Sequence, residues 1–469
     1  MQARIKVKPS LFYSLIPLLI MGLLLGVGYG VYHIRAEALL IISATVAGIM
    51  AWRIGWTWKE LESGIVDSVT QAMPAMLIVI TVGLLIGSWI ISGTIPMMIH
   101  YGMDIISPKY FLITASILCS VVSLFTGSSW GTVGTVGIAL MGIAESFGLP
   151  RGMTAGAIIT GAYFGDKISP FSDTTNLAPI AARSNLFDHI RHLLWTTTPA
   201  WLIGLIIYLF LGLYYIDHNV DAGVLNLIQV NLAAAFNYHW LLLLPPLIVL
   251  VAAVKKMPTL PSMLASAFTA ALLALIFQSH SLTQILDVMV NGYVSATGDA
   301  QIDRLLTRGG MMSMMGVTLI ALCAFAFAGI VRKAGMLDTI LQSLSKWISS
   351  RGSLILTTAG SAITVAIITG SSFLAIIIPA ELFANLFSKM GLAAKNLSRT
   401  VEDSGTVIVP LVPWSMAGVY MSGTLGVSTL AYIPWAFMCY LGVFFAILYG
   451  YTGIGIAEKI LDDETQQGS

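Results

Sequence analysis

The chain has 469 residues, of which 57% are hydrophobic and 10% are charged, and its mean hydropathy is +0.88. A single soluble core cannot bury that much apolar surface, so the composition predicts an all-α polytopic membrane protein. The formal net charge of +1 offers no basic face, and nucleic acid is therefore excluded as an expected partner.

Apolar segments long enough to cross a bilayer recur along the whole chain. The expected spans lie near residues 11–32, 37–52, 72–92, 109–125, 127–147, 195–216, 238–254, 259–279, 313–331, 353–369, 371–388 and 430–451. Residues 150–180 and 398–425 are too interrupted by glycine, proline and charge to be ordinary spans. We predict discontinuous helices or re-entrant hairpins there, and we call these two regions the first and second interruptions.

Basic residues precede the first span and follow the second. They are Arg4, Lys6 and Lys8 on one side and Arg53 and Lys59 on the other. Because cytoplasmic loops are enriched in lysine and arginine, this pattern predicts a cytoplasmic N-terminus and a span at 72–92 that runs outward. The segment TWKELESGIVDSV at 57–69 suits either a helix along the membrane surface or an ordinary amphipathic connector.

An internal repeat relates the two halves of the chain. TGSSW at 126–130 matches TGSSF at 369–373, and PFS at 170–172 matches PWS at 413–415, both at an offset of 243 residues. A Gly-Leu dipeptide between these motifs keeps the same offset. Three matches in register without a gap indicate a duplicated structural unit.

The charges after the repeated spans predict that the two units are inverted. The spans at 72–92 and 313–331 are counterparts, and the first is expected to end outside the cell. Arg332 and Lys333 follow the second and indicate a cytoplasmic end. The predicted organisation is N-terminal transmembrane helices at 1–55, a first repeat at 56–216, connecting transmembrane helices at 217–282, a second repeat at 283–453 and a polar C-terminal tail at 454–469.

Each interruption places carboxylates in apolar surroundings. The two stretches are GAYFGDKISPFSDTTNLAP at 161–179 and EDSGTVIVPLVPWS at 402–415, and their carboxylates are Asp166, Asp173, Glu402 and Asp403. The accompanying hydroxyl and amide groups are Ser169, Thr174, Thr175, Asn176, Ser404 and Thr406. A carboxylate costs about 2.5–3.5 kcal/mol at the centre of an isolated membrane helix, so each of these needs a compensating partner.

A bound cation would provide that compensation. Na⁺ is a hard ion that prefers carboxylate, hydroxyl and carbonyl oxygen, and protons compete for the same oxygens. We assign Asp166, Asp173 and Asp403 as Na⁺ ligands that alternate between Na⁺ and H⁺, with Glu402 in the same ion-binding and proton-coupling set. Such competition at one site is a sufficient mechanism for exchange of H⁺ against Na⁺.

Structural roles are the alternative for these residues. The charged groups could instead form permanent ion pairs, and the candidate pairs are Asp166–Lys167, Asp173–Arg183 and Glu402–Arg399. His189 and His192 lie outside both interruptions, where they suit either an interfacial position or a role in sensing pH.

The repeated TGSS motifs resemble the starts of half-helices. Free N–H groups and hydroxyls at such starts could bind an anionic substrate group or complete the ion shell, whereas close helix packing is the structural alternative. The candidate residues are Thr126, Ser128, Ser129, Thr369, Ser371 and Ser372.

The two interruptions, together with RLLTRGGMMSMM at 304–315, resemble the NhaC family of bacterial sodium/proton antiporters in the ion transporter superfamily. The likeness covers most of the chain. It implies a secondary active transporter of the bacterial inner membrane that exchanges Na⁺ for H⁺ and serves pH homeostasis. Similar malate/lactate antiporters move a small carboxylate, so an organic acid exchanger is the alternative.

The resemblance also bears on partners and cofactors. It implies membrane lipid, sodium ions and protons as partners, no cofactor besides the transported ions, and a homodimer, because similar transporters are commonly dimers. No dimer face is legible in the sequence.

Two other classes of membrane protein compete with a carrier. An intramembrane aspartyl protease requires GxGD, whereas residues 163–166 read YFGD, and neither HExxH nor GxxxxGK[ST] occurs. An enzyme and a primary pump are therefore not expected. A cation channel could also use carboxylates, but two broken helices favour an occluding carrier.

Overall fold

The structure is a computed structural model that describes residues 6–459 apart from 30, 33, 220 and 221. Arg4 and the last ten residues of the predicted C-terminal tail lie outside the described residues. The described part is helical, without β-strands, and contains two isolated β-bridges. The predicted all-α fold is confirmed.

The helices of the N-terminal and first-repeat regions follow the apolar pattern closely. They are α1 (Leu11–Leu23), α2 (Ala36–Arg53), α3 (Trp58–Ile91), α4 (Thr94–Ile105), α5 (Phe111–Thr126), α6 (Ser129–Thr132), α7 (Ile138–Ser146), α8 (Arg151–Ile168), α9 (Asp173–Ala182) and α10 (Leu186–Asn219). A π-helical stretch at Val133–Gly137 joins α6 to α7, so this segment is helical throughout.

The connecting region and the second repeat complete the chain. Their helices are α11 (Ala222–Ala235), α12 (Leu244–Val254), α13 (Thr259–Phe277), α14 (Leu282–Asn291), α15 (Ala300–Leu306), α16 (Met315–Lys333), α17 (Met336–Leu344), α18 (Arg351–Thr369), α19 (Ser372–Lys389), α20 (Ala394–Gly405), α21 (Met416–Leu425), α22 (Thr429–Tyr432) and α23 (Phe437–Thr452). The predicted boundaries at 216 and 282 fall within α10 and at the start of α14.

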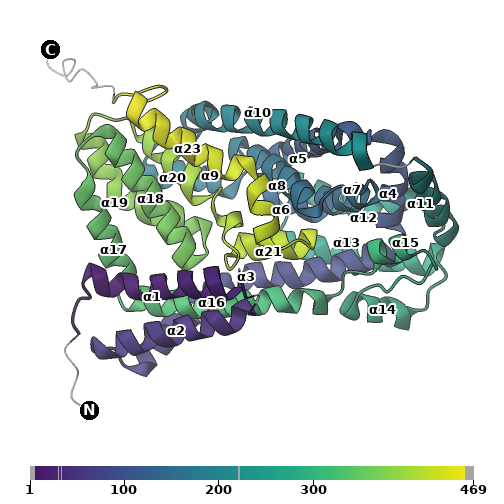
Figure 1. The fold of residues 1–469 in the computed structure, drawn as a ribbon, viewed down its shortest axis with the longest axis horizontal. Helices are drawn as coiled ribbons and strands as arrows, with labels where there is room; N and C mark the ends of the chain where they lie inside the picture. The colour runs from purple at the N-terminus through teal and green to yellow at the C-terminus, as the bar shows by residue number, and fades with distance from the viewer. Residues whose placement is uncertain (1–5, 30, 33, 220–221, 460–469) are drawn as a thin grey trace.

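The long helices run along one axis of the molecule. In Figure 1, α3, α10, α13 and α16 lie along the horizontal direction, with α17 and α19 at the left end and α11, α14 and α15 at the right end. Within the described residues, nine helices are long and apolar enough to cross a membrane, or up to twelve if each of three bent helix pairs is one span. The chain is a multi-pass membrane protein.

Residues 57–69 form neither a separate surface helix nor a connector, the two alternatives that the sequence left open. They start α3, which continues for 34 residues to Ile91. The backbone N–H and the hydroxyl of Thr57 both donate to Glu60 Oε2 at 2.9 Å, which fixes the first turn ahead of the apolar run. Pro74 is the one proline inside α3, and the helix passes through it unbroken.

Both predicted interruptions are present. The first separates α8 from α9 at residues 169–172, and the second separates α20 from α21 by a 3₁₀ turn, with a 47° bend. The TGSS motifs also behave alike. α5 ends at Gly127 (φ 65°) and α18 at Gly370 (φ 63°), in a left-handed conformation that glycine adopts without strain, and Ser128 and Ser371 then cap the next helix.

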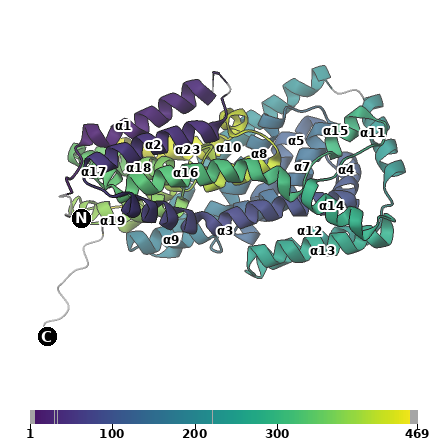
Figure 2. The ribbon, with the colours of Figure 1, turned by 90° about the horizontal axis from the view of Figure 1, so that it is seen from below.

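The counterpart helices α3 and α16 are antiparallel. Gly64 lies against Gly329, and Gly83 lies against Gly310, whose N–H donates to the Gly83 carbonyl at 2.7 Å. Residue numbers therefore rise along one helix as they fall along the other. Repeats of parallel topology would place these helices parallel, so the predicted inversion is confirmed. Figure 2 shows the two helices side by side.

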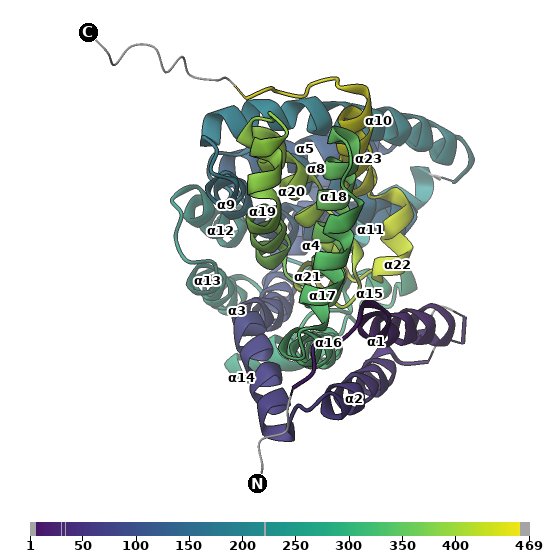
Figure 3. The same ribbon diagram turned by 90° about the vertical axis from the view of Figure 1, so that its left-hand side faces the viewer.

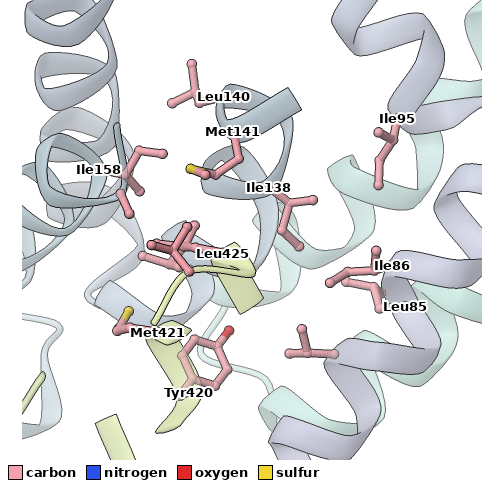
Figure 4. Packing of buried hydrophobic residues seen from close by; sticks show 14 of the residues in the cluster. Leu85, Ile86, Ile95, Ile138, Leu140, Met141, Ile158, Tyr420, Met421 and Leu425 are labelled. Atoms are coloured by element: carbon pink, nitrogen blue, oxygen red, sulfur yellow. The ribbon is translucent and has the colours of Figure 1, made fainter. Parts of the chain in front are cut away.

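Each repeat inserts the second half of its broken helix into the other repeat. Met421 and Leu425 of α21 share one buried cluster with Ile86 of α3, Ile138 of α7 and Ile158 of α8 (Figure 4). In return, α9 packs against α19 and α20. This exchange of halves brings the two interruptions together between the repeats.

Candidate functional site

The most unusual element is α20, a polar helix buried inside an apolar protein. Every residue from Asn396 to Gly405 is buried, although the sequence NLSRTVEDSG contains few apolar side chains. The helix packs against α9, α10, α18, α19 and α23, and Figure 3 shows α18 and α19 in front of it. Because buried polar groups are costly without partners, their contacts indicate what this helix is for.

A buried ion pair joins the two repeats. Lys167, in the last turn of α8, contacts Asp403 Oδ1 of α20, and the two side chains are 1% and 0% exposed. The Thr196 hydroxyl of α10 donates to the same oxygen at 3.1 Å. Asp403 Oδ2 has no hydrogen-bond partner among the described residues. The predicted Asp166–Lys167 pair is therefore wrong, because Lys167 reaches across to the other repeat.

Asp166 takes a hydroxyl partner from the first TGSS motif. Ser129 Oγ donates to Asp166 Oδ2 at 2.7 Å, so the start of α6 meets the end of α8. Thr175 donates to the backbone carbonyl oxygens of Asp166 and Lys167 at 3.2 and 3.1 Å. The turn that carries both charged residues is thus held from two sides.

Glu402 is fully buried, and neither carboxylate oxygen accepts a hydrogen bond within the described part of the chain. The predicted pair with Arg399 is wrong, since Arg399 Nη1 donates to the Gly455 carbonyl at 2.7 Å. The charges that act on Glu402 belong to Lys167 and Asp166. A buried carboxylate without a partner is stable only when it is protonated or holds a cation.

Asp173 lies outside the buried set, although its charge still acts on Asp166. It occupies the first position of α9 and is exposed, and the predicted pair with Arg183 does not appear among the ion pairs of the described residues. Among those residues, no group of three or more His, Cys, Asp or Glu side chains could hold a metal ion. The Na⁺ site predicted from Asp166, Asp173 and Asp403, which would also use hydroxyl and carbonyl oxygens, stays a prediction.

Several predicted supporting residues stabilise the backbone around the site. They donate to carbonyl oxygens: Ser169 to Leu124 at 2.6 Å, Asn176 to Pro170 at 2.8 Å and Ser172 at 2.7 Å, Ser404 to Thr400, Thr126 to Ser123 at 3.5 Å and Thr369 to Val365 at 2.8 Å. Thr174 and Thr406 instead lie beside Glu402, and the Thr406 hydroxyl has no partner in the described structure.

The two TGSS motifs are not equivalent. Ser128 and Ser371 accept from the backbone N–H groups of Gly131 at 3.0 Å and Leu374 at 3.4 Å, as helix caps do. Ser129 reaches Asp166, whereas its counterpart Ser372 is half-buried and enters no hydrogen bond that the structure shows. The first motif therefore contacts a buried carboxylate, whereas the hydrogen bonds shown for the second stay within its own repeat.

Sequence reasoning missed contributions from α10 and α23. His189 and His192 are buried rather than interfacial, and they share one face of α10 with Thr196 at spacings of three and four residues. In the sequence, this spacing indicates a polar face on an otherwise apolar helix. Gly442 of α23 covers the ion pair, and a Cβ there would lie 3.7 Å from both Asp403 Oδ1 and Lys167 Nζ. No local pattern distinguishes Gly442 from other helix glycines.

Inverted repeats whose broken helices enclose charged groups define the fold of a secondary transporter. A sequence profile of the Na⁺/H⁺ antiporter family matches residues 15–175 and 161–454. The chain is 45% identical over 456 residues to an uncharacterised Na⁺/H⁺ antiporter of Haemophilus influenzae, covering 96% of this chain and 97% of that protein. The chain belongs to the Na⁺/H⁺ antiporter family.

Two further relatives show the range of names in this family. The Na⁺/H⁺ antiporter NhaC of Alkalihalophilus pseudofirmus is 38% identical over 456 residues, covering 96% of this chain and 98% of that protein. A malate-2H⁺/Na⁺-lactate antiporter of Bacillus subtilis is 35% identical over 414 residues, covering 88% of each chain. The resemblance to NhaC proteins found in the sequence is confirmed.

Proposed function

We propose that this protein is a Na⁺/H⁺ antiporter of the bacterial inner membrane. The observation that carries the proposal is the buried cluster in which Glu402, without a partner, lies beside the Lys167–Asp403 ion pair. A permanent structural ion pair would need no second, unneutralised carboxylate next to it. Relatives named as Na⁺/H⁺ antiporters over nearly the whole chain support this assignment.

In the proposed cycle, Lys167 and the transported ions compete for the same carboxylates. The ammonium group of Lys167 compensates Asp403 while the site is closed. Na⁺ entering the site displaces it and gains oxygens from Asp403 and Glu402, and the proton that neutralised Glu402 leaves. Asp166, held by Ser129, contributes charge from the other repeat. Return of a proton reverses these steps.

The orientation and surroundings of the protein form part of the proposal. Lys59 lies in the first turn of α3 and Lys333 ends α16, at the end of the molecule where Gly64 meets Gly329. Basic residues collect at this end, which supports a cytoplasmic N-terminus. Membrane lipid surrounds the apolar outer helices. The homodimer stays a prediction.

Purified protein in liposomes is expected to move protons when NaCl alone is added, read with a pH-sensitive dye. A response that requires malate or lactate together with sodium would replace the proposal with organic acid exchange, the activity in the name of the Bacillus subtilis relative. Unitary currents in a planar bilayer would identify a channel instead. Protein-free liposomes with NaCl are the control.

Asp173→Asn is expected to keep most of the Na⁺-driven proton movement, because this carboxylate is exposed at the start of α9 and outside the buried cluster. The matched variant is Asp166→Asn, which makes the same chemical change in the buried site. This variant is expected to lose the Na⁺-driven proton movement. Initial rates in the liposome assay distinguish the two. An equal loss in both variants would return Asp173 to the ion site.

A further inference from the structure

The helices α10 and α20 face each other through polar side chains. The contacts are His189 Nδ1 to Ser398 Oγ at 2.8 Å, His192 Nε2 to Asn396 Oδ1 at 3.1 Å and Thr196 Oγ1 to Asp403 Oδ1 at 3.1 Å. All six residues are buried. The interface therefore forms a polar row that begins at the ion-pair carboxylate and leads toward the N-terminal end of α20.

Buried polar atoms without partners lie along the same row. Within the described residues they include His189 Nε2, Arg399 Nε and Nη2, and Asp403 Oδ2. Nearly all buried polar atoms in folded proteins bond to protein or to ordered water, so each exception needs an explanation. Several exceptions in a row, ending at a site that exchanges protons, fit a route that water enters.

The far end of the row is covered by the segment after α23, residues 453–459. Arg399 Nη1 donates to the Gly455 carbonyl at 2.7 Å, and Asn396 Nδ2 donates to the Ala457 carbonyl at 2.6 Å. The N–H of Ala457 donates back to Asn396 Oδ1 at 3.0 Å. In Figure 3 this yellow segment passes beside α10. The row thus runs from the buried ion pair to a surface segment.

The chemistry of the row suits protons and not Na⁺. A neutral imidazole has one donor and one acceptor nitrogen, and a hydroxyl both donates and accepts, so each can pass a proton along. The charged groups that face the two histidines are Lys167, Arg399 and Lys395, and all are cations. Na⁺ needs several oxygen ligands around one point, whereas the oxygens of Ser398, Asn396 and Thr196 lie singly along the row.

We propose that the α10–α20 interface is a proton path that connects Asp403 with the end of α20 beneath residues 453–459. His189 and Thr196 relay the proton, Ser398 positions the His189 ring, and Arg399 orients the water between them. Na⁺ reaches the carboxylates by another route. This inference depends on the proposed Na⁺/H⁺ exchange and adds a route for one of its two ions.

The test compares two assays on His189→Gln. Na⁺-driven proton movement is expected to slow by about tenfold or more, because glutamine keeps a hydrogen-bonding side chain but cannot relay a proton. Exchange of radioactive Na⁺ against unlabelled Na⁺, which transfers no proton, is expected to stay at the wild-type rate. The matched control is His280→Gln, at the opposite end of the molecule, which is expected to leave both rates unchanged.

Three results would overturn the proton path. An unchanged proton rate in His189→Gln means that protons travel elsewhere, and an equal fall of both rates means that His189 only supports the site. If that variant does not fold, Ser398→Ala removes the same hydrogen bond, and the same two outcomes apply. Wild-type protein without Na⁺-driven proton movement would instead remove the proposed function, and the path with it.

Discussion

Asp403→Asn is expected to abolish Na⁺-driven proton movement and to destabilise the protein. The change removes a proposed cation ligand and leaves the Lys167 ammonium group, which is 1% exposed, without its carboxylate partner. Removing one member of a buried ion pair costs about 3–5 kcal/mol, since the other charge stays buried and uncompensated. The liposome assay measures transport, and thermal unfolding in detergent measures stability.

A double variant separates these two effects. Asp403→Leu with Lys167→Met replaces the pair by apolar side chains, and such replacements are often neutral or stabilising. The double variant is expected to recover thermal stability without recovering transport. Wild-type transport in Asp403→Asn, or in the double variant, would remove the ion pair from the exchange mechanism.

Gly165→Ala is expected to destabilise the protein and to stop exchange. A Cβ at this position would lie 2.2 Å from the Ser120 carbonyl oxygen and 2.6 Å from the Leu124 backbone nitrogen, so α5 and α8 would have to separate. Overpacking of this kind typically costs about 1–3 kcal/mol and sometimes more. Separation would also pull Ser129, which follows α5, away from Asp166, near the end of α8.

Gly316→Ala is the matched control, because a Cβ at Gly316 meets no atom within 4 Å. Alanine in a helix is more favourable than glycine by roughly 0.5–1 kcal/mol, so this variant is expected to be neutral or slightly stabilised. The two glycine substitutions should therefore shift the unfolding temperature in opposite directions. A shift of the same size and sign in both would mean that the α5–α8 contact is not specific.

The fold was largely predictable because its signals are local. The apolar runs have the length of a bilayer span, and glycine, proline and charge mark both interruptions. The repeat was readable from three matches at one offset, namely the TGSS motifs, the Gly-Leu dipeptides and the PFS and PWS triplets. The start of α3 was also readable, since Thr57 and Glu60 have the spacing of a helix cap, yet the segment equally suited a surface helix or an amphipathic connector.

The ion pairs were not predictable from neighbours in the sequence. Asp166 and Lys167 are adjacent on a helix and so point in different directions, and Lys167 finds its partner 236 residues later. Arg399 and Glu402 are three residues apart on a helix, which permits an ion pair, but Arg399 Nη1 donates to the Gly455 carbonyl instead. These contacts depend on how the repeats interlock, and no local pattern encodes that.

The buried charges near α20 have a consequence for how tightly the movements of Na⁺ and H⁺ are coupled. Asp166, Glu402 and Asp403 share this region with Lys167 and Arg399, so three negative charges face two positive ones when all are ionised. One bound Na⁺ or one bound proton would neutralise the single excess negative charge. Without either ion the site keeps that charge in apolar surroundings, and moving a net charge through them is costly. In the proposed cycle, such a carrier would reorient when loaded with either ion and stay in place when empty, which would make the exchange obligatory and keep the sodium gradient from running down.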